Sequence, residues 1–104
     1  MPRGIDPKDW EVISEIACDI VNAEMIEDDI LTNSYTLRML DTLNGFRKRY
    51  GDHPALLATI GDYLESPAER KRYYHRALQI ARETNDLEEV DEILDSLRQL
   101  EEGE

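Results

Sequence analysis

Long apolar runs and cysteine are scarce in this sequence, and each scarcity excludes a class of protein. No run of apolar residues is long enough to span a bilayer, and the opening MPRGIDPKDW lacks the apolar stretch of a signal peptide. The one cysteine, Cys18, cannot form an internal disulfide. We therefore expect a protein of the reducing cytoplasm, with no membrane association.

Catalytic and metal-binding motifs are also missing. The two histidines, His53 and His75, have no companion Cys or His at the spacing of a metal site. We expect His53 to start a helix and His75 to be exposed. The sequence contains no glycine-rich phosphate loop, no G-x-S-x-G and no H-E-x-x-H. It therefore predicts no catalytic residue, no metal site and no cofactor, and we do not expect an enzyme.

Positive charge is scarce as well. The chain has 12 Lys and Arg against 24 Asp and Glu, for a net charge of −12. Phosphate binding needs clustered Lys and Arg, so direct binding of nucleic acid is not expected. The acidity fits either solubility or a partner protein with a basic surface. The charge is uneven, because residues 1–34 carry −7, residues 35–82 carry +4 and residues 83–104 carry −9.

Strand-like alternation is nearly absent, whereas helix signals recur along the chain. Asp6-Pro7 offers an N-cap followed by proline, and Ser66-Pro67-Ala68-Glu69 has the form of a capping box. Gly51 fits the left-handed conformation past a helix end. Asn44-Gly45 does not interrupt the helical phase, and we interpret Gly45 as allowing a neighbour to pack closely.

These signals predict an all-α fold of five antiparallel helices. A length of 104 residues suits a single domain with a modest core, so we expect residues 1–104 to form one domain. The expected helices span about 7–25, 28–50, 54–64, 67–83 and 87–101.

Apolar residues recur in these segments at the spacing of one helix face. The expected buried stripes are Trp10, Ile13, Ala17, Ile20 and Val21; Leu37, Leu40, Leu43 and Phe46; Leu56, Leu57, Ile60, Gly61 and Leu64; Tyr74, Ala77, Leu78 and Ala81; and Leu87, Val90, Leu94, Leu97 and Leu100.

The chain is similar to itself at an offset of 34 residues. At this offset the turn Gly51-Asp52 falls on Asn85-Asp86, and apolar positions stay in register across most of two helices. Repeats of this length indicate stacked helical pairs, each burying its apolar face on its neighbour.

Two short motifs within this repeat resemble the tetratricopeptide family. Ile60-Gly61 is similar to the Leu-Gly of that family's first helix, and Tyr74-His75-Arg76-Ala77-Leu78 is similar to the Tyr-x-x-Ala-Leu of its second. The resemblance covers about residues 33–102. The distance between the two motifs is three residues shorter than in the family, and Arg70 stands where the family has a small alanine.

The resemblance implies a right-handed stack of helical hairpins that binds peptides or protein surfaces in a groove. A simple five-helix bundle is the alternative architecture. Half of the groove positions are carboxylates, which favours a basic guest, although any solvated helix face looks similar. The groove would be lined by the first helix of each repeat, here at Ala55, Ala58, Asp62, Glu65, Glu89, Glu92, Ser96 and Gln99.

Basic residues gather near the start of the fourth expected helix, where they oppose the helix dipole. Something negative should therefore lie nearby. It could be the acidic helices of the same chain, a second copy, or a partner's carboxylates or phosphate bound at an anion site. This candidate anion or partner patch comprises Arg70, Lys71, Arg72, His75 and Arg76. Arg70 falls within the arc of the buried stripe, but we expect it to reach out because it lies near the helix end.

Three functions remain open from the sequence. The leading one is a small bacterial-type adaptor or chaperone-like scaffold that binds a basic segment of another protein. The second is an acidic inhibitor, such as an immunity protein or a DNA mimic. The third is a structural homo-oligomer, such as a homodimer, in which the basic middle of one copy meets the acidic ends of another.

Overall fold

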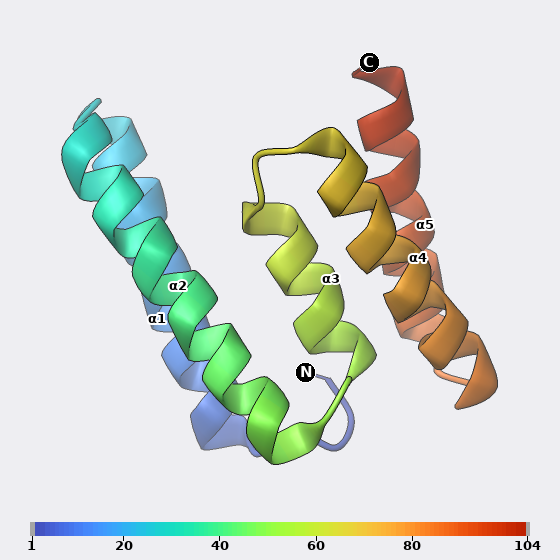
Figure 1. Cartoon of the computed structure of the whole chain (residues 1–104). Helices are drawn as coiled ribbons and strands as arrows, with labels where there is room; N and C mark the ends of the chain where they lie inside the picture. Colours follow the sequence, from blue (N-terminus) through green and yellow to red (C-terminus); the bar gives the residue numbers. More distant parts are fainter. Residues whose placement is uncertain (1, 104) are drawn as a thin grey trace. The chain divides into compact units, whose positions relative to one another are not determined.

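The computed structural model describes residues 2–103, which form five helices and no strand, as expected. The helices are α1 (Pro7–Met25), α2 (Asp29–Tyr50), α3 (Pro54–Tyr63), α4 (Pro67–Glu83) and α5 (Leu87–Glu102) (Figure 1). Each bound lies within one residue of the sequence expectation. The sequence predicts one domain, and the contacts within the chain gather into two compact units, a first unit up to Tyr50 and a second unit from Gly51 onward.

The first unit is a helical hairpin in which α1 and α2 lie side by side (Figure 1). The N-cap of α1 is Asp6, whose carboxylate accepts a hydrogen bond from the amide of Lys8 at 2.9 Å. A left-handed residue, Glu27, with a φ of 56°, follows the end of α1. The next amide, that of Asp28, donates to the carbonyl of Ala23 at 3.0 Å, which closes the turn.

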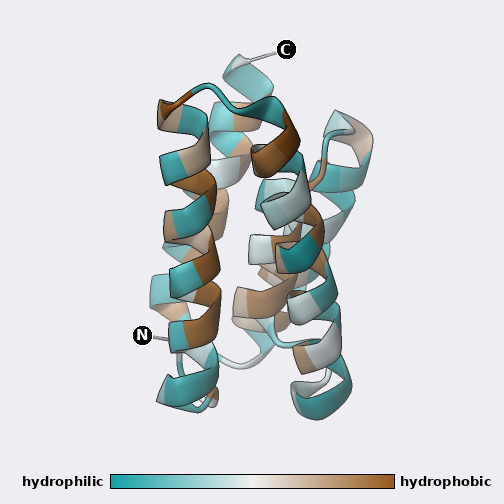
Figure 2. Cartoon of the chain, turned by 90° about the vertical axis from the view of Figure 1, so that its left-hand side faces the viewer, coloured by the Kyte–Doolittle hydropathy of each residue, from teal (hydrophilic) through white to brown (hydrophobic). Residues whose placement is uncertain are grey.

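Apolar and hydrophilic residues alternate around the helices, as Figure 2 shows, but the expected stripes are wider than the buried faces. Val21 and Leu37 are 54% and 64% exposed, so their assignment to buried stripes is wrong. Helix α2 does continue through Gly45, as expected. The interpretation of Gly45 as a packing site is wrong, because no atom beyond its chain neighbours and its own helix backbone lies within 4 Å of where its Cβ would be.

The second unit packs α4 against both α3 and α5, and α3 also reaches α5. The predicted stripe of α4 is confirmed, because Tyr74, Ala77, Leu78 and Ala81 are all buried. These four side chains form one hydrophobic cluster with others from α3 and α5, namely Leu57, Ile93 and Leu97. The stripe of α5 is confirmed only in part, since Leu87 and Leu94 are 70% and 37% exposed.

Local side chains set the helix ends of the second unit. His53 starts α3 as expected, because its Nδ1 accepts a hydrogen bond from the amide of Ala55 at 3.1 Å. Ser66 caps α4, accepting from the amide of Glu69 at 3.4 Å. Gly51 takes the left-handed conformation that the sequence predicted, with a φ of 74°. The hairpin of α3 and α4 therefore has defined ends, which fixes the residues that meet across it.

Candidate functional site

A pocket of about 410 Å³ opens within the second unit, where α3 ends, α4 begins and α5 ends. Three residues separate α3 from α4, so the last turn of one helix lies next to the first turn of the other. Polar side chains dominate its wall, and Pro67 and Leu100 contribute apolar surface. The polar lining residues are Asp62, Arg70, Tyr74, Ser96 and Gln99.

Tyr74 is the centre of a hydrogen-bond network in this pocket. Its hydroxyl donates to Asp62 Oδ1 at 2.5 Å and accepts from Arg70 Nη2 at 3.2 Å. Arg70 Nε donates in turn to the carbonyl of Gly61 at 3.1 Å, in the last turn of α3. The network therefore joins the end of α3 to the first two turns of α4.

A glycine is required beside this tyrosine. A Cβ at Gly61 would lie 2.8 Å from Cε1 of Tyr74, which is closer than side chains pack. The ring has little freedom to move away, because Tyr74 is 1% exposed and its hydroxyl is bonded on both sides. Gly61 thus allows Tyr74 to lie directly against α3.

The surroundings of the network raise the pKa of both Tyr74 and Asp62. Burial, and next the hydrogen bond to Asp62, raise the pKa of Tyr74 to about 12, while Arg70 opposes both. Asp62 keeps some contact with solvent, yet burial is the largest influence on its carboxylate. Burial raises the pKa of Asp62, because it outweighs the hydrogen bond from Tyr74 and the charge of Arg70.

Three of the eight predicted groove positions line this pocket together, although they come from two helices: Asp62 on α3, and Ser96 and Gln99 on α5. The expectation that all eight point outward is wrong for Ala55 and Glu89, which are 2% and 8% exposed. The remaining three lie outside the pocket lining, with Ala58 half-buried and Glu65 and Glu92 exposed.

The structure divides the predicted basic patch. Arg70 turns inward to Gly61 and Tyr74, so the expectation that it reaches out from the helix is wrong. Its partners are a carbonyl at the negative end of α3 and, through the tyrosine hydroxyl, a carboxylate. Arg72, His75 and Arg76 are exposed, and Arg76 donates to Gln79 at 3.2 Å. Lys71 is half-buried.

Sequence reasoning missed the polar role of Tyr74. Its position in the apolar stripe correctly predicted a buried ring, but helical spacing carries no information about the hydroxyl. The available signal was Arg70, a charged residue inside the buried arc of α4 and four residues before the tyrosine. Pro67, Leu100 and Gly103 were also missed as pocket residues.

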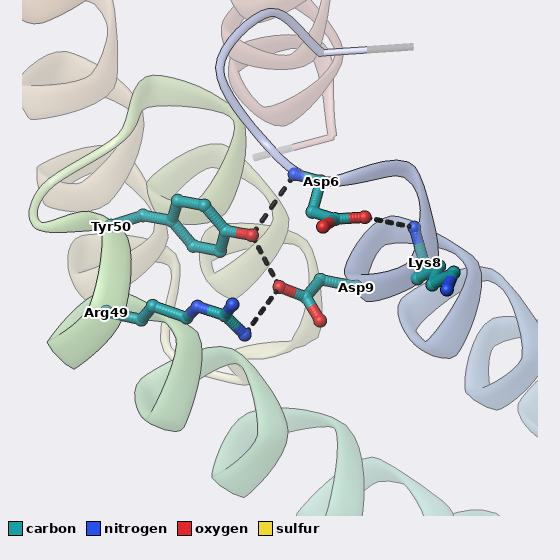
Figure 3. A network of polar contacts seen from close by, with 5 residues as sticks. All are labelled: Asp6, Lys8, Asp9, Arg49 and Tyr50. Carbon is teal, nitrogen blue, oxygen red and sulfur yellow. Dashed lines mark hydrogen bonds and ion pairs between the residues drawn. The ribbon is translucent and has the colours of Figure 1, made fainter.

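A second polar network lies in the first unit and ties the end of α2 to the start of α1 (Figure 3). The hydroxyl of Tyr50 donates to Asp9 and accepts from the amide of Asp6 at 3.1 Å. Arg49 forms an ion pair with the same Asp9 carboxylate at 3.1 Å. The hydrogen bond to Asp9 is the main cause that raises the pKa of Tyr50. The contacts link the end of α2 to the start of α1 through Asp9 and Tyr50, so we assign this network to the stability of the hairpin.

Other kinds of site were sought in the part of the chain that the structure describes. Residues 2–103 contain no group of three or more His, Cys, Asp or Glu arranged to hold a metal ion. Within the same range, no helix combines the length and apolarity that crossing a membrane requires.

Comparison with known proteins gave no relative: no family model, no curated protein and no solved structure matches the chain. The chain's own residues and contacts therefore carry the functional argument.

Proposed function

We propose that the chain is a non-enzymatic interaction module whose second unit binds a basic segment of another protein. The binding face is the one that α3 and α5 share, and the helices of the second unit are arranged as in a tetratricopeptide repeat. The observation that carries the proposal is the meeting of Asp62, Ser96 and Gln99 in one pocket. Helices α3 and α5 occupy corresponding positions in the 34-residue repeat. A groove lined by these two helices requires their outward side chains to lie next to each other.

Two further contacts support the repeat-like arrangement. Helix α4 packs on both α3 and α5, and α3 also touches α5, as successive helices of a stack do. Gly61 and Tyr74 lie at the positions that resemble the family's Leu-Gly and Tyr-x-x-Ala-Leu motifs, and they pack directly on each other. A close contact between motif positions gives the resemblance a physical cause.

The charge of the face favours a basic guest. Asp62, Glu65 and Glu92 are exposed predicted groove positions, and the one basic side chain in the pocket lining, Arg70, already has bonded partners. A partner segment rich in Lys and Arg would gain from attraction to the carboxylates and from steering by the net charge of −12.

The experiment compares two triple variants that lose the same charge. One neutralises the groove face (Asp62→Asn, Glu65→Gln, Glu92→Gln), and the other neutralises exposed positions outside the pocket (Glu88→Gln, Asp91→Asn, Glu101→Gln). Binding to an arrayed library of 12-residue peptides is measured at low salt for wild type and both variants. We expect selection of basic peptides by wild type, loss of binding in the groove variant, and retention in the control.

The reverse result would favour the acidic inhibitor. Helix α5 carries a second set of carboxylates on its exposed face, at Glu88, Asp91, Asp95 and Glu102. An inhibitor or DNA mimic would use this array, so its binding to a basic protein would be lost in the control variant and kept in the groove variant.

A structural homo-oligomer predicts self-association at low salt, which sedimentation of the wild-type chain measures. Equal loss in both variants would contradict the assignment of the groove.

A further inference from the structure

The charges in the pocket are unequally compensated. Among residues 2–103, Asp62 accepts one hydrogen bond, from the hydroxyl of Tyr74. Arg70 makes two hydrogen bonds, and its guanidinium carbon lies 5.9 Å from the centre of the Tyr74 ring, within reach of a cation–π contact. The Arg70 guanidinium therefore has several partners. The Asp62 carboxylate, in contrast, has one oxygen, Oδ2, without a hydrogen-bond donor.

The helix ends around the pocket add negative potential. Helices α3 and α5 both finish at the pocket, with Asp62 in the last turn of one and Gly103 after the end of the other. Carbonyls at a helix C-terminus carry partial negative charge, and neither last turn contains a basic residue, although Arg70 of α4 donates to the Gly61 carbonyl of α3. The start of α4 has the opposite sign, but proline occupies its first position and Ser66 bonds the amide of Glu69.

The remaining wall suits a long side chain with a charged end. Gln99 is exposed and makes no side-chain hydrogen bond among residues 2–103, so its amide oxygen can accept one. Leu100 and Pro67 offer apolar surface of the kind that the methylene stem of a lysine or arginine covers. The volume of about 410 Å³ falls within the range of about 300–1,000 Å³ that is common for ligand pockets.

We propose that this pocket takes one lysine or arginine side chain of a partner segment, with its charged head at Asp62 Oδ2 and its stem on Leu100 and Pro67. The proposal rests on the proposed function, because it names the anchor residue of the guest at that face. The raised pKa of the Asp62 carboxylate agrees with it, since an added cation would stabilise the ionised form.

The test uses blocked pentapeptides that differ only at the central residue, with Lys, Arg, norleucine or Glu between glycines. Binding to the full chain is followed by NMR shifts of the Gln99 side-chain amide and the backbone amides of Asp62 and Ser96. We expect the Lys and Arg peptides to bind with millimolar dissociation constants, and the norleucine and Glu peptides to bind about tenfold more weakly or worse.

Asp62→Asn should weaken the Lys peptide about tenfold, because asparagine lacks the charge that the ammonium meets. Asparagine keeps an oxygen for the Tyr74 hydroxyl, so the variant should fold, and its NMR spectrum checks this directly. The control Asp91→Asn makes the same charge change at an exposed site outside the pocket lining, and it should alter the affinity by less than about twofold.

Three results would overturn the proposal: equal affinity for the Lys and norleucine peptides, an unchanged affinity in Asp62→Asn, or preference for the Glu peptide. The last result would assign Arg70 as the recognition group. A longer basic peptide that binds wild type and Asp62→Asn equally would overturn the anchor and leave the proposed function standing. Failure of every basic peptide, long or short, would overturn both.

Discussion

Replacement of Gly61 by alanine should destabilise the second unit, whereas the same replacement at Gly45 should stabilise α2. Both glycines lie inside helices, so each alanine gains about 1 kcal/mol of helix propensity. The surroundings differ. At Gly61 the new Cβ would lie 2.8 Å from Cε1 and 3.1 Å from Cδ1 of Tyr74, whereas at Gly45 no atom beyond its chain neighbours and its own helix backbone lies within 4 Å.

The size of the stability loss in Gly61→Ala depends on how far the Tyr74 ring can move away from the new Cβ. Tyr74 is buried against α3, and hydrogen bonds to Asp62 and Arg70 hold its hydroxyl. Overpacking of this kind costs about 1–3 kcal/mol, which exceeds the propensity gain of about 1 kcal/mol. We expect Gly61→Ala to lower the free energy of unfolding by up to about 2 kcal/mol, and Gly45→Ala to raise it by about 0.5–1 kcal/mol.

Urea unfolding followed by far-UV circular dichroism measures both changes in one assay, with the denaturant slope checked for each variant. Gly61→Ala should lower the midpoint and Gly45→Ala should raise it. A double variant with Tyr74→Phe adds a second test, because the ring then loses both hydrogen bonds and can shift. The penalty of Gly61→Ala should shrink in that background. A Gly61→Ala chain as stable as wild type would refute the packing argument.

The remaining predictions concern titration and backbone strain. Tyr74 has a pKa of about 12 in the folded chain against 10.0 ordinarily, so the folded state holds its proton more tightly; this contribution to stability is complete below pH 10 and is lost as pH rises toward 12. Tyr74→Phe should flatten the alkaline loss in urea midpoints, and an unchanged loss would contradict the raised pKa of the buried Tyr74 hydroxyl. Burial, and next the neighbouring carboxylates, raise the pKa of Glu89 to about 7 from 4.5, so stability should increase as pH falls from 7 to 4.5. Glu89→Gln should reduce that slope in thermal unfolding at a series of pH values, and an equal slope would be inconsistent with its burial. Glu27→Gly should stabilise the chain by up to about 1 kcal/mol in thermal unfolding, because Glu27 has a φ of 56°. Asn85→Gly, at a φ of 58°, is the control and should gain less, since asparagine tolerates the left-handed conformation.

The helix ends were predictable because the residues that stop and start a helix act on their own neighbours. Asp6 and Ser66 accept hydrogen bonds from amides two and three residues ahead, and Gly51 takes the left-handed conformation at its own position. None of these contacts depends on the rest of the fold. Composition and spacing therefore located all five helices to within one residue.

The exposed parts of the apolar stripes were not predictable in this way. Val21 and Leu37 keep helical phase with buried neighbours, yet both are mostly exposed. Periodicity shows which side of a helix is apolar, but the neighbouring helices decide how wide an arc they cover. Leu87 is the first residue of α5, so no preceding turn of the helix covers its side chain.

The pocket forms through tertiary contacts, which the spacing of residues along a helix does not indicate. Sequence reasoning placed Asp62, Ser96 and Gln99 on one expected surface through the 34-residue offset, and they do line one pocket. It placed Arg70 outward, since a charged residue near a helix start ordinarily meets water. The carbonyl of Gly61 that accepts its hydrogen bond lies nine residues earlier, across the turn between α3 and α4. Helical periodicity stops at that turn, so it gave no indication of the partner.

Fold and site share their contacts in the second unit. The Tyr74 ring lies against Gly61 and so holds α4 on α3, while its hydroxyl fixes the Asp62 carboxylate at the pocket. The hydroxyl can donate only one hydrogen, and Asp62 Oδ1 receives it, so the lone pairs of Oδ2 remain available to another donor. Tyr74, which packs α4 against α3, thus also determines which oxygen of the Asp62 carboxylate can accept a further hydrogen bond.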